Sequence, residues 1–243
     1  MKKGMLSIVI PAHNEEARIG HTLGDYLKYF SSEHHGDFEI VVVPNGCNDN
    51  TVEIVTRYTR RSDRIRLRSL KRKAGKGRAA KEGFSIAQGD TVSFVDADGA
   101  TSPRELEKLV KQLGDNDGVI GSRWLPESNI LKSQGLARKI ASRGFNMLVR
   151  VMFGLPFKDT QCGAKVFKKK ALDDVQNELK TSGFIFDVEL IYKLRQRGYK
   201  IEEIAITWEN RQLSTLNLFA AIPTMLLALL WLRLSNWLTK LRL

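Results

Sequence analysis

The sequence contains only two cysteines in 243 residues, Cys47 and Cys162. Two thiols are too few for a disulfide framework, so we expect the chain to work in a reducing compartment. Histidine is scarce too, and the four histidines lack the spacing of a metal site, so we expect them to be solvated. Internal repeats and low-complexity linkers are also missing, which excludes a repeat architecture and favours one globular domain with an appendage at most.

The chain opens without a long hydrophobic run. Residues 6–10 form a short apolar stretch that ends at Pro11, whereas the core of a signal peptide is longer. We therefore interpret this stretch as a buried strand.

The other end of the chain is uncharged from 212 to 232, but Pro223 interrupts this apolar run. A transmembrane helix needs about 20 predominantly apolar residues, so the run is marginal as a span. Beyond it, Arg233, Asn236 and Lys240 recur at helical spacing, with leucine and tryptophan on the other side. We expect 214–243 to form amphipathic helices in a membrane interface, with packing on a partner subunit or a true span as alternatives.

The rest of the chain, residues 1–213, alternates short apolar runs with helical periodicity. This rhythm predicts an α/β domain with a mostly parallel sheet and helices on both faces, with ligands at the carboxyl ends of the strands. We expect strands at 6–11, 38–43, 65–70, 91–95, 119–122, 164–167 and 201–208, and helices at 14–30, 78–87, 137–153 and 186–197, with another helix starting at Pro103.

Two carboxylates, Asp96 and Asp98, follow directly on the strand expected at 91–95. At this spacing they can converge on one divalent cation, and oxygen ligands of this kind suit Mg²⁺ or Mn²⁺ together with substrate phosphates. An ordinary turn with a helix cap is the alternative.

A glycine-containing loop lies ahead of the helix at 78–87, with Lys76 beside Gly77. It lacks the position of a Rossmann fingerprint and the hydroxyl residue of a Walker A loop. A lysine and backbone N–H groups at a helix start favour an anion, while a solvated basic loop is the alternative.

Three further residues could hold a phosphate. Arg123 can bind phosphate oxygens with a bidentate fork, and Arg138 and Ser142 share a helix face at i and i+4. Surface arginines in a basic protein are the alternative interpretation.

A fourth polar set contains Asp159, Gln161, Asp187 and Glu189. Asp187 follows an apolar approach and could act as a general base at the edge of an apolar wall. It also stands where a helix N-cap would be, which is the simpler alternative.

These motifs, in this order, resemble glycosyltransferase family 2, whose fold is GT-A, a Rossmann-like fold of nucleotide-diphospho-sugar transferases. The first half of the chain matches the family broadly, including its dolichyl-phosphate mannosyltransferases, and the second half is similar to the dolichyl-phosphate glucosyltransferase branch. The resemblance rests on residues 7–15, 73–83, 96–99, 121–123, 158–163, 186–190 and 203–208.

The resemblance implies roles on the donor side of a catalytic domain over 1–213. The diphosphate would be held by a metal on Asp96 and Asp98. Nucleotide-sugar contacts would come from Pro11, Ala12, Asn14, Glu15, Asn45, Lys76, Gly77, Asp96 and Ala97. The family's Asp-Asp-Gly-Ser is Pro44-Asn45-Gly46-Cys47 here, so Asn45 is uncharged and the base, uridine or guanosine, stays open.

The resemblance also implies roles for residues on the acceptor side. The lipid phosphate of a polyprenyl acceptor would lie among Arg123, Arg138, Ser142, Asp159 and Gln161. The acceptor oxygen would attack the anomeric carbon with inversion, and an ionised phosphate needs little help from a base such as Asp187. The resemblance thus implies a metal-dependent transferase that moves hexose from UDP-glucose, or next GDP-mannose, to dolichyl phosphate at the cytoplasmic face of a membrane. A soluble or lipid-linked glycan acceptor is the alternative.

The net charge of +12 is concentrated in one segment. Residues 57–81 contain twelve Lys and Arg against Asp63 alone and so carry eleven of these charges. A nucleic-acid-binding module would need aromatics interleaved with the cations of this segment and a recognition motif, whereas the segment has Tyr58 alone and no such motif. A nucleotidyltransferase would need a basic glycine-rich loop directly after the first strand, and this loop is also missing. We expect the segment to face an anionic membrane or to steer phosphorylated substrates.

Overall fold

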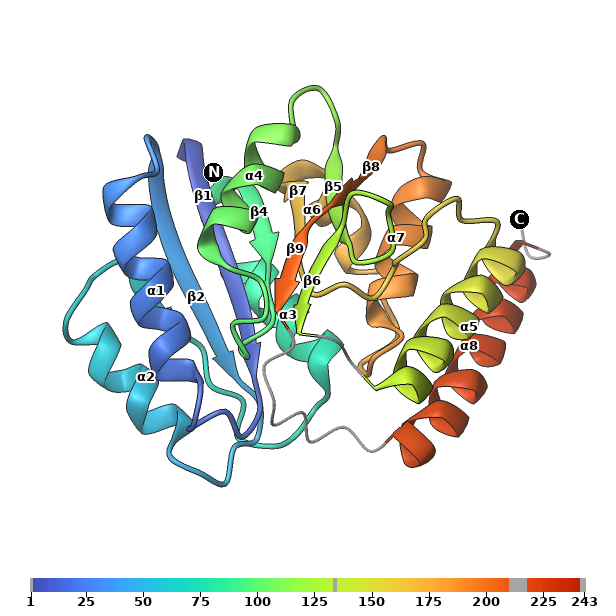
Figure 1. The fold of residues 1–243 in the computed structure, drawn as a ribbon, viewed down its shortest axis with the longest axis horizontal. Helices are drawn as coiled ribbons and strands as arrows, with labels where there is room; N and C mark the ends of the chain where they lie inside the picture. The colour runs from blue at the N-terminus through green and yellow to red at the C-terminus, as the bar shows by residue number, and fades with distance from the viewer. Residues whose placement is uncertain (1, 133–134, 210–217, 241–243) are drawn as a thin grey trace.

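The computed structural model describes residues 2–132, 135–209 and 218–240 and is built on one seven-stranded sheet (Figure 1). Its strand order is β3-β2-β1-β4-β7-β5-β8. Only β7 runs antiparallel to its neighbours, so the predicted mostly parallel sheet is confirmed. The strands are β1 (Lys2–Ala12), β2 (Asp37–Pro44), β3 (Ile65–Leu67), β4 (Gly89–Phe94), β5 (Gly118–Ser122), β7 (Lys165–Lys168) and β8 (Ile201–Ala205).

Helices cover both faces of the sheet, also as predicted. Side chains alternate along the strands, so that Ile8 and Val9 of β1 are buried in different core clusters. Helices α1, α2 and α4 pack on one face, and α3, α5, α6 and α7 contribute to the other. The helices are α1 (Ile19–Ser32), α2 (Thr51–Thr59), α3 (Lys76–Ile86), α4 (Pro103–Gln112), α5 (Leu136–Phe153), α6 (Lys169–Gln176), α7 (Phe186–Gln196) and α8 (Leu218–Lys240).

The first helix begins five residues later than the predicted Asn14. Asn14 has a φ of 55°, in the left-handed region that helices exclude, and the chain turns before the helix starts at Ile19. The predicted start was wrong because the polar residues that follow β1 form a loop instead of a first helical turn.

The strand predicted at 201–208 is two strands in different sheets. After β8, Ile206 donates its N–H to Ser122 and accepts a hydrogen bond from the N–H of Asn129. The chain thereby passes to β9 (Thr207–Glu209), which pairs with β6 (Asn129–Lys132) in a separate two-stranded sheet. The continuous apolar pattern gave no sign of this change of partner.

The C-terminal segment contains one helix, α8, without the break predicted at Pro223. Pro223 lies in the second turn, where it removes one backbone hydrogen bond near the helix end. Helix α8 lies beside α5 (Figure 1) and buries Leu229 and Leu232 in the core. The structure does not describe residues 210–217 and 241–243, nor the side chains of 218–222 and 236–240. The predicted amphipathic pattern of Asn236 and Lys240 therefore lies outside the described residues.

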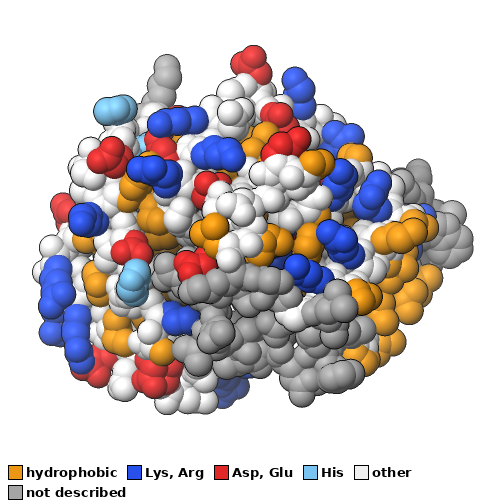
Figure 2. Space-filling model, in the orientation of Figure 1, with side chains coloured by type: hydrophobic (Ala, Val, Ile, Leu, Met, Phe, Trp, Pro, Cys, Tyr) orange, Lys and Arg blue, Asp and Glu red, His pale blue; other side chains and the backbone are white. Residues whose placement is uncertain are grey.

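The outer side of these two helices exposes large apolar side chains, which gather at one edge of the molecule (Figure 2). We define the apolar face of α5 and α8 by the residues Ile140, Met147, Val151, Leu227, Leu230, Trp231 and Leu234, each 49–76% exposed. Within the described residues, no helix combines the length and hydrophobicity needed to cross a bilayer.

The basic segment 57–81 is partly neutralised by acids from elsewhere in the chain. Six of its twelve cations form ion pairs with carboxylates outside the segment, for example Arg66 with Glu39 at 2.8 Å. The pairs are Arg57–Glu53, Arg64–Asp37, Arg66–Glu39, Arg68–Glu82, Lys76–Asp96 and Arg78–Glu82. The segment still carries eleven of the net charges, but half of its cations have a carboxylate partner from outside it, which a charge count within the segment does not show.

Candidate active site

The predicted donor residues collect at the carboxyl edge of the sheet. Strands β1, β2 and β4 are parallel neighbours, so the segments that follow them meet at one edge. Pro11 and Ala12 end β1, Asn45 follows β2, and Asp96 and Asp98 follow β4. This is the place where ligands bind in open α/β sheets.

Four charged side chains form a connected cluster at this edge. Lys76 Nζ, at the start of α3, lies 2.7 Å from Asp96 Oδ1 and 3.7 Å from Asp187 Oδ2. The other oxygen of Asp187 lies 2.6 Å from Nζ of Lys165, a fully buried lysine in β7. Both ammonium groups also lie over the ring of Phe94, at 5.0 and 5.7 Å from its centroid.

Within this cluster, Lys76 and Asp96 stabilise each other's charged form. Burial alone would lower the pKa of Lys76, but Asp96 and Asp187 hold it above its ordinary value. Burial would raise the pKa of Asp96, yet Lys76 holds that pKa below the usual range. The centre thus keeps an ionised carboxylate and a charged ammonium in direct contact.

Asp98 differs from Asp96, because burial and the nearby charge of Asp96 both raise its pKa. Two carboxylates that repel each other suit a divalent cation. Among the described residues, no cluster of three or more His, Cys, Asp or Glu could hold a metal, so a cation here would have only this pair of carboxylates from the protein. Few carboxylates completed by water and substrate phosphates are the usual Mg²⁺ arrangement, and the donor set therefore fits Mg²⁺ or Mn²⁺.

Two glycines allow the close packing of this centre. A Cβ on Gly163 would lie 1.9 Å from Oδ2 of Asp96, so only glycine leaves room for that carboxylate. A Cβ on Gly77 would lie 2.5 Å from Cβ of Phe186. The N–H of Gly77 donates to the carbonyl of Ser182 at 2.7 Å, so this backbone group already has a partner in place of the predicted anion.

Arg123 and Asp159 form a bidentate pair beside the cluster. Nε and Nη2 of Arg123 donate to the two oxygens of Asp159 at 2.7 and 2.9 Å, and the N–H of Arg123 donates to the same carboxylate at 3.0 Å. Burial would lower the pKa of Arg123 and raise that of Asp159, but each charge stabilises the other and both groups stay ionised. Asp159 therefore orients the guanidinium, whose side chain is 14% exposed.

Helix α5 reaches the same loop through Asn146. Its Oδ1 accepts hydrogen bonds from the backbone N–H and hydroxyl of Thr160, at 2.9 and 3.0 Å. Ser142 lies one turn earlier on α5, on the same face, and Gln161 donates to the carbonyl of Phe184 at 3.3 Å. Arg138 lies in the first turn of α5, and its side chain is outside the described ones.

The loop after β1 is tied to the residues that follow β2. The side chain of Asn14 accepts a hydrogen bond from the N–H of Asn48 at 2.9 Å, and the N–H of Glu15 donates to the hydroxyl of Thr51 at 2.7 Å. Asn45 is buried, and its Oδ1 accepts from the N–H of Ala74 at 2.7 Å. Asn45 thus holds the loop that leads to Lys76.

Two charged residues of the site were missed from the sequence. Lys165 interrupts the short apolar strand Ala164–Phe167, and a lysine inside such a strand was the available signal. Arg18 forms a bidentate pair with Glu15, at 2.7 Å for both bonds, and gave no signal beyond its sequence proximity.

Cys162, in contrast, is fully buried, and burial raises its pKa to about 12, so it stays a neutral thiol and packs as a small residue.

Known proteins resemble this chain in sequence and in fold. Residues 7–176 match the family described as Glycosyl transferase family 2. The chain is 32% identical over 209 residues to Glycosyltransferase AglD of Haloferax volcanii, covering 85% of this chain but only 33% of AglD. It is also 32% identical over 228 residues to the dolichyl-phosphate beta-glucosyltransferase of Dictyostelium discoideum, covering 89% of this chain and 70% of that protein. This chain thus spans a third of the length of AglD.

A solved structure shares the fold. Glucosyl-3-phosphoglycerate synthase from Mycobacterium tuberculosis, crystallised with Mn²⁺, UDP-glucose and phosphoglyceric acid, superposes with a TM-score of 0.67 at 19% identity. The match covers 94% of this chain and 79% of that one. At this identity the likeness establishes the GT-A fold alone.

Proposed function

This chain belongs to glycosyltransferase family 2, and from that premise we propose that it transfers a hexose from a nucleoside diphosphate sugar to a polyprenyl phosphate such as dolichyl phosphate. UDP-glucose is the favoured donor, followed by GDP-mannose. The reaction inverts the anomeric carbon, depends on Mg²⁺ or Mn²⁺, and takes place at the cytoplasmic face of a membrane. The proposal rests on relatives with the same reaction in their names and on the charged centre at the carboxyl edge of the sheet.

One observation carries the proposal: Lys76 and Asp96 form an ion pair next to Asp98, where β4 ends. A diphosphate leaving group needs positive charge beside it, and this edge offers an ammonium group together with two carboxylates for a cation. Asp96 and Asp98 would hold the metal, which supplies Lewis-acid charge to the departing diphosphate. The ammonium group of Lys76, which lies 3.7 Å from Asp187 Oδ2, would face the phosphates.

On the donor side, Pro11, Ala12, Asn14 and Glu15 line the nucleotide pocket with Ala97. Arg18 orients Glu15 through its two hydrogen bonds. Asn45 acts by holding the loop before α3, since its side-chain oxygen bonds to Ala74.

On the acceptor side, Arg123 binds the lipid phosphate, and Asp159 sets the angle of its guanidinium. Arg138, Ser142 and Gln161 complete this half of the site. An acceptor phosphate is ionised at neutral pH, so positioning and charge compensation provide most of the rate enhancement.

The role of Asp187 as a general base remains a separate prediction. Its two oxygens face Lys165 and Lys76, which is the environment of a group that positions lysines. A base role predicts that Asp187→Asn loses turnover with an altered pH profile. Near-normal turnover would instead mean that the acceptor oxygen attacks unaided.

Membrane contact is the other part of the proposal. The apolar face of α5 and α8 is the surface that would enter the lipid interface, because it exposes large side chains such as Trp231 beside Arg233. The basic segment 57–81 would add attraction to anionic lipids through those of its cations that lack an ion pair.

The decisive experiment is a donor and acceptor screen with the purified chain. UDP-glucose, GDP-mannose and other nucleotide sugars are incubated with Mg²⁺ or Mn²⁺, with and without a polyprenyl phosphate, and released nucleoside diphosphate is measured. We expect release from UDP-glucose only when the polyprenyl phosphate is present, and none with a chelator. Transfer to a soluble glycan without any polyprenyl phosphate would contradict the proposal.

A further inference from the structure

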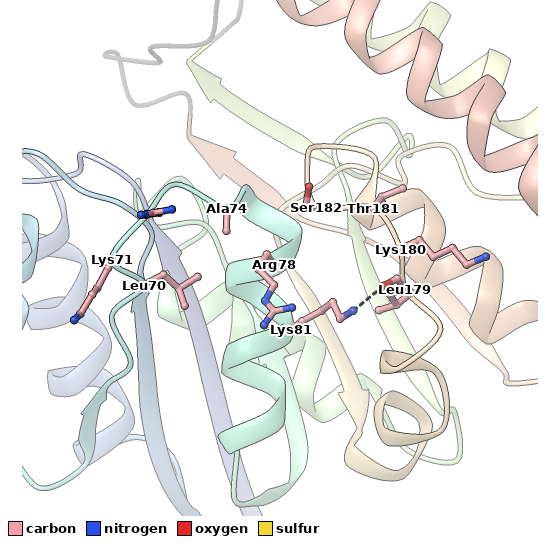
Figure 3. A pocket seen from close by; sticks show the side chains of 10 residues that line it. Leu70, Lys71, Ala74, Arg78, Lys81, Leu179, Lys180, Thr181 and Ser182 are labelled. Carbon is pink, nitrogen blue, oxygen red and sulfur yellow. Dashed lines mark hydrogen bonds between the residues drawn. The ribbon is translucent and has the colours of Figure 1, made fainter.

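A groove of about 570 Å³ lies between the segment 70–74, helix α3 and the segment 179–182 (Figure 3). Its lining contains five cations and no acid, namely Lys71, Arg72, Arg78, Lys81 and Lys180. None of the lining residues belongs to the predicted nucleotide, metal or acceptor sets. The groove therefore lies outside the residues assigned to the transfer reaction, although four of its cations belong to the basic segment 57–81 that we propose to attract anionic lipids.

Arg78 and Lys81 form the centre of this groove. They are three residues apart on α3, so they share one helix face, and both project into the space between the two loops (Figure 3). Arg78 uses Nη2 on Glu82 at 2.7 Å, and Lys81 Nζ donates to the carbonyl of Leu179 at 2.6 Å. A guanidinium has five N–H donors and an ammonium three, so each side chain keeps donors for a ligand.

The wall opposite α3 is held in place before any ligand arrives. Glu189 is fully buried and accepts hydrogen bonds from the N–H groups of Lys180 and Thr181 and from the hydroxyl of Thr181. The carbonyl of Ser182 accepts from the N–H of Gly77 at 2.7 Å. A preformed wall lowers the entropic cost of binding.

The charges around the groove favour a negatively charged ligand. Burial and, next, the charge of Arg78 lower the pKa of Lys81. The charges of Glu189 and Glu82 offset this lowering only in part, and Glu82 is already shared by Arg78 and Arg68. An anion between the two α3 cations would remove their mutual repulsion.

We propose that this groove is a second anion site that binds a phosphomonoester or diphosphate group through Arg78 and Lys81, with Lys71, Arg72 and Lys180 at its rim. The same chemistry is offered by a soluble phosphate compound and by the headgroup of a lipid such as phosphatidic acid. The site is separate from Asp96 and Asp98 and needs no metal, because its donors are cationic.

Calorimetric titration with pyrophosphate, at low ionic strength and with EDTA present, tests the soluble source. We expect saturable binding to the unaltered chain and a dissociation constant at least about tenfold weaker for the double variant Arg78→Gln/Lys81→Gln. The matched control is Arg104→Gln/Lys170→Gln, which removes the same charge from exposed positions outside the groove and should retain the affinity. Circular dichroism checks that both variants are folded.

A second arm tests the lipid source by co-sedimentation with phosphatidylcholine vesicles, with and without phosphatidic acid. Pyrophosphate binding that needs Arg78 and Lys81 supports a soluble ligand, and extra binding to phosphatidic acid that needs them supports a headgroup. Absence of saturable binding in both arms, or equal losses in the two double variants, would overturn the site. Neither arm contains sugar donor or metal, so the outcome is independent of the proposed transfer reaction.

Discussion

The buried cations at the sheet edge and the cations of the groove beside them have opposite surroundings. Lys76, Lys165 and Arg123 each contact a carboxylate within 2.7 Å, and Lys165 has no exposed surface. In the groove, Arg78 is the one lining cation with an ion pair among those formed by the described residues, with Glu82, and no acid lines the surface. Cations of the first kind neutralise carboxylates at the sheet edge, whereas most of those of the second kind have no carboxylate partner among the described residues. The same residue types thus occur in two electrostatic settings, one rich in carboxylates and one poor in them.

The largest effect that tests this comparison is expected at the metal pair. Asp98→Ala should lower sugar transfer by about a thousandfold, because the charge that holds the cation on the diphosphate is lost. Initial rates with Mg²⁺ or Mn²⁺ measure it, and circular dichroism should report an unchanged fold. The control is Asp115→Ala, an exposed aspartate away from the site. Full activity of Asp98→Ala, or of the unaltered enzyme with a chelator, would remove the metal role.

The next effect concerns stability. Lys165→Met leaves the carboxylate of Asp187 without its nearest partner in the interior, and breaking a buried pair typically costs about 3–5 kcal/mol of unfolding free energy. Urea denaturation measures the loss, and the exposed Lys170→Met serves as control. The double variant Lys165→Met/Asp187→Leu should recover much of it. A loss below about 1 kcal/mol for Lys165→Met would show that burial does not separate the two kinds of cation.

A smaller effect is expected at the apolar face of α5 and α8. Leu230→Gln/Trp231→Gln should weaken binding to anionic vesicles by about tenfold, since less apolar surface enters the interface. The control is Leu131→Gln, because Leu131 is similarly exposed but lies on β6. Equal binding of both variants in a co-sedimentation assay would argue for a protein partner on this face.

The smallest effect belongs to the exposed part of the basic segment. Arg60→Gln/Arg61→Gln should change the unfolding free energy by no more than about 0.5 kcal/mol, because neither arginine forms an ion pair in the part of the chain that the structure describes. Urea denaturation of this variant and of Lys165→Met, measured side by side, compares their losses of unfolding free energy directly. A loss of about 2 kcal/mol or more would mean that surface cations here are structural.

Much of the fold was predictable, because strand and helix periodicity are local properties. The helix predicted to start at Pro103 does so, and the Ser102 hydroxyl caps it by accepting a hydrogen bond from the N–H of Glu105. The late start of α1 was not predictable, since it depends on the left-handed conformation of Asn14. The change of sheet at Ile206 also escaped the pattern, because an apolar run does not say with which strand it pairs.

The site was predictable to a similar extent. Asp96 and Asp98 could be singled out because two carboxylates directly after a buried strand indicate a candidate metal site from neighbouring residues alone. Lys165 did not, because its role depends on Asp187, twenty-two residues later. Gly163 has a role only because Asp96 approaches it.

The sequence alone determined the parallel α/β arrangement, the carboxylate pair after the fourth strand and the resemblance to glycosyltransferase family 2. These follow from patterns within a few residues of one another. Only the tertiary structure decided which charges neutralise which, turning half of the cations of 57–81 into ion pairs and leaving others to line a groove. The physical reason is that electrostatic interaction depends on distance in space and on burial, and the fold sets both.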